Sequence, residues 1–75
     1  MEKEVISIIS ELTFIGLEEI SQEDSLISLG IDSLKAVELI VKLEEHFGIV
    51  FDDSDLDPEK LTTVQTVIEL INQYV

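Results

Sequence analysis

Residues 34–47, LKAVELIVKLEEHF, form the longest stretch of helical spacing in the chain. Apolar residues recur there every three or four positions, the spacing that places them on one face of an α-helix. Asp32 and Ser33, just before the stretch, are residue types that favour the N-terminus of a helix. Gly48, just after it, favours the C-terminus. The sequence therefore predicts a long helix over residues 34–47.

This helix is more apolar than a simple surface helix. With about 100° of rotation per residue, the expected core stripe consists of Ala36, Leu39, Ile40, Leu43 and Phe47. A second arc beside it consists of Leu34, Val37 and Val41, flanked by Glu38, Glu44 and Glu45. Carboxylates are almost never fully buried without a partner. The second arc is therefore either an exposed docking surface or a second packing face, and periodicity favours neither.

The other segments complete the predicted fold. Apolar spacing predicts a helix over residues 3–14, ended by Gly16, and a last helix that begins near Val64 with Thr62 or Thr63 as its cap. Residues 17–31 are expected to form a long loop, and residues 52–59 a turn leading into a short helical piece with Pro58 in its first turn. The expectation is one all-α domain over residues 1–75, a small four-helix bundle of three longer helices and one short helix with a long first loop.

Composition limits the classes of function. The 75 residues include 17 acidic and 4 basic side chains, which gives a net charge of −13, and 45% of the residues are hydrophobic. Such a charge repels nucleic acid and anionic membranes and attracts basic partners. No apolar run reaches the length of a membrane span, and the N-terminus does not resemble a secretory signal. We expect a folded, monomeric, cytoplasmic protein.

The chain has few groups for chemistry of its own. It has no cysteine and a single histidine, His46, which lies 13 residues beyond Ser33 on the same predicted helix. At 1.5 Å per residue the two are roughly 20 Å apart, so His46 cannot activate Ser33 as a nucleophile. Ser33 remains either a helix cap or the acceptor of a modifying group, and a helix N-terminus favours a phosphate there.

An acidic turn offers the only candidate for a metal site. Asp53, Asp55 and Asp57 match the first ligands of an EF-hand loop, but Pro58 stands where glycine is required and Val64 where a bidentate glutamate is required. The EF-hand motif therefore fails, and we expect a solvated acidic turn and no metal site, with weak binding of a divalent ion as the alternative.

The run Leu29-Gly30-Ile31-Asp32-Ser33-Leu34 resembles the phosphopantetheine attachment site of acyl and peptidyl carrier proteins. Residues 37–47 resemble the second helix of that family, and residues 57–65 resemble its third helix and the start of its fourth. The resemblance covers essentially the whole chain.

The resemblance implies a carrier and not an enzyme. Ser33 would hold 4′-phosphopantetheine, installed from coenzyme A by a phosphopantetheinyl transferase, and Asp32 would flank the group. The thiol of the arm would carry acyl or aminoacyl groups as thioesters for loading enzymes and synthases with basic docking surfaces. The implied partner-binding residues are Ile31, Leu34, Val37, Glu38, Val41, Glu44 and Glu45.

The pathway stays open between fatty-acid, polyketide and nonribosomal-peptide biosynthesis. Lys35 and Ala36 after the Ser-Leu pair look more like polyketide or nonribosomal-peptide carriers, whereas the C-terminal half looks closer to fatty-acid carriers. The alternatives are an aminoacyl carrier of the D-alanyl type and an acidic helical adaptor without a prosthetic group.

Overall fold

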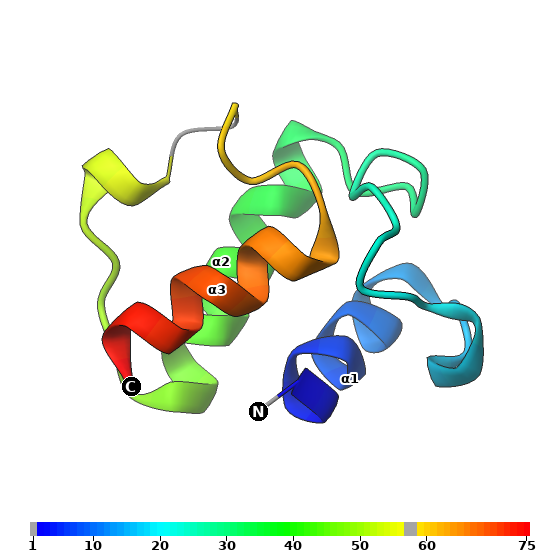
Figure 1. Cartoon of the computed structure of the whole chain (residues 1–75), viewed down its shortest axis with the longest axis horizontal. Helices are drawn as coiled ribbons and strands as arrows, with labels where there is room; N and C mark the ends of the chain where they lie inside the picture. The colour runs from blue at the N-terminus through cyan, green and yellow to red at the C-terminus, as the bar shows by residue number, and fades with distance from the viewer. Residues whose placement is uncertain (1, 57–58) are drawn as a thin grey trace.

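The computed structural model describes residues 2–56 and 59–75, which fold into three α-helices joined by irregular segments (Figure 1). The helices are α1 (Glu2–Thr13), α2 (Ser33–Phe47) and α3 (Val64–Tyr74), and short 3₁₀ turns occur at η1 (Leu17–Glu19) and η2 (Asp53–Asp55). No β-strand occurs in these two ranges, so the all-α prediction with its long first loop is confirmed. The expected short helix falls partly on Asp57 and Pro58, which lie outside the described residues.

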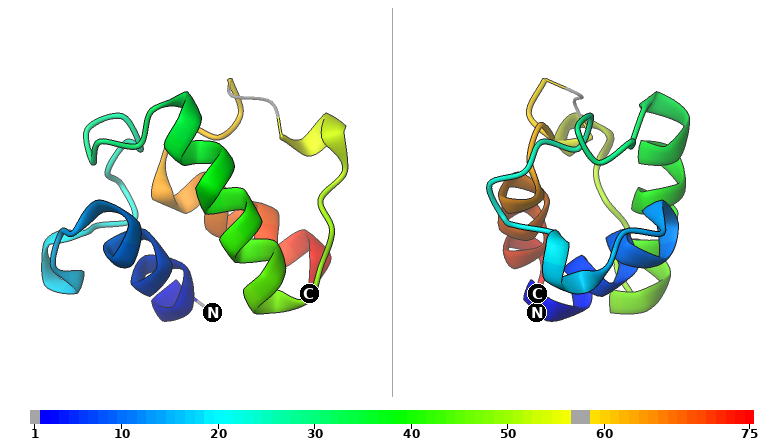
Figure 2. Two further views of the ribbon diagram at one scale, coloured as in Figure 1. Left: turned by 180° about the vertical axis from the view of Figure 1, so that it is seen from behind. Right: turned by 90° about the vertical axis from the view of Figure 1, so that its right-hand side faces the viewer.

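The three helices surround one apolar core (Figure 2). Each helix contributes fully buried side chains, namely Val5, Ile9, Leu39, Leu43, Val64, Val67 and Ile71. The first loop adds Leu26, Leu29 and Ile31, and the segment after α2 adds Phe51. Burial of one such side chain stabilises the fold by about 1.5–3 kcal/mol. Of the helices in the described ranges, none is long and apolar enough to cross a membrane.

The observed end of α2 and the observed start of α3 agree with the predicted ones, whereas the end of α1 does not. Gly48 ends α2 at a φ of 66°, and Thr63, one of the two expected caps, forms a capping box with Thr66 at the start of α3. Helix α1 was expected to end at Gly16, but the chain leaves it at Phe14, whose φ is 60°. The Ser10 hydroxyl donates to the carbonyl of Ile15 at 2.5 Å and stabilises this turn. The positive φ at the end of α1 is therefore adopted by Phe14 and not by a glycine.

The first loop is joined to the start of α3 by main-chain hydrogen bonds. The Leu26 N–H donates to the Thr62 carbonyl at 3.0 Å, the Val64 N–H to the Asp24 carbonyl at 3.0 Å, and the Gln65 N–H to the Gln22 carbonyl at 2.9 Å. Because this loop leads directly into α2, the start of α3 also fixes where α2 begins.

Candidate functional site

Ser33 is the first residue of α2, and its side chain is exposed. Of the two possible caps, the structure uses Asp32, whose carboxylate accepts the Lys35 N–H at 2.9 Å. A capping side chain satisfies one of the backbone donors left unpaired at a helix N-terminus. The Ser33 hydroxyl makes no hydrogen bond to any other described residue, so it faces solvent and is available for reaction.

A tight turn over residues 25–31 leads into Ser33. The Ile31 N–H donates to the Leu26 carbonyl at 2.9 Å, and the Gly30 N–H to the Ile27 carbonyl at 3.0 Å. Gly30 has a φ of 86°, a backbone conformation that residues other than glycine rarely adopt. The turn buries Leu26 and Ile31 but leaves Ile27 84% exposed.

The second apolar arc of α2 lies at the surface. Leu34, Val37 and Val41 are 77%, 63% and 45% exposed, whereas Leu39 and Leu43 on the core stripe are 1% and 0% exposed. We call Leu34, Val37 and Val41 the apolar strip. Glu38 and Glu45 beside it are also exposed. The structure thus resolves the question left open by periodicity in favour of a surface strip that starts next to Ser33.

Two of the expected partner-binding residues, Ile31 and Glu44, are less exposed than the apolar strip. Ile31 is only 2% exposed and its side chain packs in the core, so its predicted role in partner binding stays a prediction that rests on its place in the loop before Ser33. Glu44 is half-buried, and its carboxylate accepts the Phe51 N–H at 2.9 Å. It therefore holds the segment after α2 against the helix.

Ile27 is a surface residue that the sequence analysis missed. It lies in the expected long loop over residues 17–31 and was not among the predicted partner-binding residues. No local sequence pattern identifies it, because its neighbours Leu26 and Leu29 in the same turn are buried whereas Ile27 is exposed.

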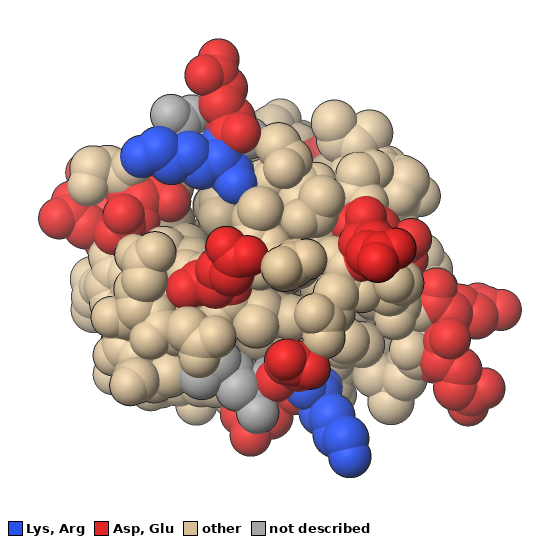
Figure 3. Space-filling view, in the orientation of Figure 1, with Lys and Arg blue, Asp and Glu red and all other residues tan. Residues whose placement is uncertain are grey.

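Acidic side chains outnumber basic ones on the surface, in line with the 17 acidic and 4 basic residues of the sequence. Figure 3 shows Asp and Glu side chains distributed over one face with little positive charge between them. Near the C-terminus, the Tyr74 hydroxyl donates to Asp55 at 2.5 Å and accepts the Asp52 N–H at 2.8 Å. The hydrogen bond to Asp55 raises the pKa of Tyr74. No group of acidic or histidine side chains within residues 2–56 and 59–75 could hold a metal ion; Asp57, one of the EF-hand candidates, lies outside them.

Comparison with known proteins agrees with this geometry. A family model described as "phosphopantetheine attachment site" matches residues 3–71. The fold is similar to that of a putative acyl carrier protein from Mycobacterium tuberculosis, with 28% identity over 97% of both chains and a TM-score of 0.82. It is also similar to a holo acyl carrier protein from Nitrosomonas europaea, with 20% identity over 96% of this chain and 92% of the other and a TM-score of 0.83. For an acyl carrier protein from Thermotoga maritima, the values are 24% identity, 97% and 89% coverage, and a TM-score of 0.77.

Proposed function

This chain belongs to the family of phosphopantetheine-attachment domains found in acyl and peptidyl carrier proteins, and we propose that Ser33 is the residue that carries the arm. The observation that supports this most directly is the exposed Ser33 hydroxyl, which the fold does not use because Asp32 provides the helix cap. Ser33 also lies in the Leu29–Leu34 run and within the residues that the family model matches.

The surroundings of Ser33 fit a phosphodiester. Unpaired N–H groups and the dipole at the N-terminus of the 15-residue helix α2 favour a negative charge there. In the loading step, the Ser33 oxygen bonds to a phosphorus atom of coenzyme A, and the P–O bond to the departing adenosine bisphosphate breaks. The serine proton passes to a base of the transferase. The arm supplies a thiol that holds the cargo as a thioester, which this cysteine-free chain cannot otherwise provide.

The apolar strip, with Glu38 and Glu45, is the proposed docking surface for the transferase and for loading enzymes and synthases. Its apolar centre and negative edge are complementary to a partner surface with an apolar centre and basic rim. Ile31 and Glu44 shape the surface from behind, through the core and through the Phe51 N–H. We place the carrier in cytoplasmic fatty-acid, polyketide or nonribosomal-peptide biosynthesis.

Intact-mass measurement tests the attachment residue. After co-expression with a broad-specificity phosphopantetheinyl transferase, the wild type should gain the mass of one phosphopantetheine, and Ser33→Ala should gain none while keeping its circular dichroism spectrum. Ser28→Ala, in the preceding turn, is the control and should be loaded. A wild type that gains no mass, or a Ser33→Ala variant that does, contradicts the proposal. The mass remaining on the thiol in the native host identifies the cargo.

A further inference from the structure

Lys35 connects the first turn of α2 to the end of α1. Its ammonium nitrogen lies 3.4 Å from the carbonyl oxygen of Leu12, which is in the last turn of α1. At the opposite end of this helix pair, His46 Nε2 of α2 lies 3.1 Å from Glu4 Oε2 of α1. The two helices are thus joined by polar contacts at both ends, and the Lys35 contact is the one beside Ser33.

The Leu12 carbonyl is a favourable partner for a cation. The last four carbonyl groups of an α-helix have no donor within the helix. They also carry the negative end of the helix dipole, so a lysine ammonium is stabilised there. Lys35 itself is half-buried, which limits the competition from water. The contact between the Lys35 ammonium and the Leu12 carbonyl is therefore favoured by the unpaired carbonyl, by the helix dipole and by partial burial.

The same residue is held at its backbone. The Lys35 N–H donates to the Asp32 carboxylate at 2.9 Å, so Lys35 is fixed to the cap of α2 by its amide and to the end of α1 by its ammonium. Ser33 lies between Asp32 and Lys35 in the chain. We propose, on the basis of the function assigned above, that Lys35 is a positioning residue: it holds the first turn of α2 against α1 and so presents the Ser33 hydroxyl to the transferase in one geometry.

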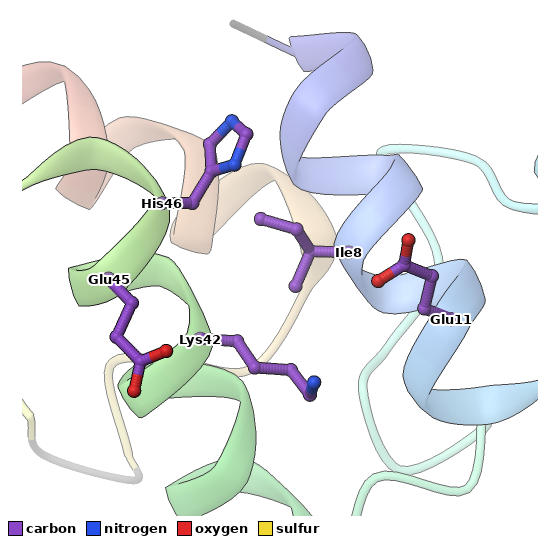
Figure 4. A pocket seen from close by; sticks show the side chains of 5 residues that line it. All are labelled: Ile8, Glu11, Lys42, Glu45 and His46. Atoms are coloured by element: carbon purple, nitrogen blue, oxygen red, sulfur yellow. The ribbon is translucent and has the colours of Figure 1, made fainter.

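Lys42 provides a matched control. It lies seven residues after Lys35, about two helical turns along the same side of α2. In Figure 4 its side chain extends into a groove of about 290 Å³ between α1 and α2, lined by Ile8, Glu11, Lys42, Glu45 and His46. Lys42 is exposed and makes no hydrogen bond or ion pair with another described residue. Its replacement removes the same charge from the same helix without breaking a hydrogen bond or ion pair.

The experiment compares Lys35→Met, Lys35→Arg and Lys42→Met in steady-state loading with coenzyme A and a broad-specificity transferase. Lys35→Met should lower kcat about three- to tenfold, the range expected for loss of one hydrogen bond of modest net strength, with little change in KM. Lys42→Met should change neither parameter. Lys35→Arg should keep kcat close to the wild-type value, because a guanidinium can donate to the same carbonyl. Equal kcat for the two Met variants, or no rescue by arginine, overturns the proposal.

Backbone amide NMR spectra separate this proposal from the attachment proposal, because they require no loading. In Lys35→Met the resonances of Phe14 and Ser33 should shift together, and in Lys42→Met they should not. A wild type that is never loaded contradicts the function assigned to Ser33. Unchanged Phe14 and Ser33 resonances in Lys35→Met contradict the positioning role.

Discussion

Val37→Asp should impair docking far more than folding. Val37 is 63% exposed, so only about a third of its side chain is removed from water. Complete burial of a valine stabilises a protein by about 1.5 kcal/mol at the low end of the range, so the substitution should cost about 0.5 kcal/mol of folding free energy. Valine and aspartate have similar helix propensities, and no acidic residue lies three or four positions from Val37, which leaves no further large cost.

The cost at a partner surface is larger. An aspartate at the centre of an apolar contact has to lose its water without gaining a partner, and the hot-spot positions that cluster near the centre of an interface are worth about 2 kcal/mol or more. This corresponds to a fall of about 30-fold in kcat/KM for loading, since 1.4 kcal/mol is a factor of ten. Intact-mass kinetics measure the loading rate, and urea denaturation followed by circular dichroism measures stability.

Val50→Asp is the matched control, because it makes the same substitution at an 82% exposed valine beyond the far end of α2. It should leave both loading and stability unchanged. Equal loading rates for the Val37 and Val50 variants would refute a docking role for the apolar strip. A loss of several kcal/mol of stability in Val37→Asp alone would show instead that the strip packs in the core.

Two further predictions concern the helix cap and the single tyrosine. Asp32→Ala should lower the free energy of unfolding by about 1 kcal/mol, because the Lys35 N–H loses its side-chain acceptor; an unchanged urea midpoint would contradict this. The pKa of Tyr74 is raised above its usual 10.0 by the hydrogen bond to Asp55. The resulting stability should be complete below pH 10.0 and be lost as the pH rises through the folded-state pKa, because the unfolded chain ionises more readily. Absorbance titration of this only tyrosine measures the shift, Tyr74→Phe should abolish that pH dependence, and a pKa at or below 10.0 in the folded protein would be inconsistent with the contact.

The sequence predicts the three long helices well because their apolar spacing extends over several turns. Local chemistry also identifies Gly48 and Thr63 as helix ends. The end of α1 could not be predicted in the same way. A bulky residue at positive φ is unfavourable in isolation, and Phe14 adopts this conformation beside a turn that the Ser10 hydroxyl stabilises.

The candidate site was predictable where a motif or a periodic face defines it. Ser33 comes from the motif, and Leu34, Val37 and Val41 come from the helical wheel. Ile27 and Ile31 show the limit, since both are isoleucines of the same aperiodic loop, yet one is 84% exposed and the other 2%. Their orientations depend on the main-chain bonds of the turn and on its attachment to α3, which no local pattern encodes.

The attachment of the first loop to α3 has a consequence for how carriers of this kind can diversify. Its three hydrogen bonds join main-chain atoms only, so they do not depend on which outward-facing side chains the loop displays. Exposed positions such as Glu23 and Ile27 can therefore be exchanged while the backbone path to Ser33 stays the same. New recognition surfaces can arise beside the serine, by selection or by design, without a new fold.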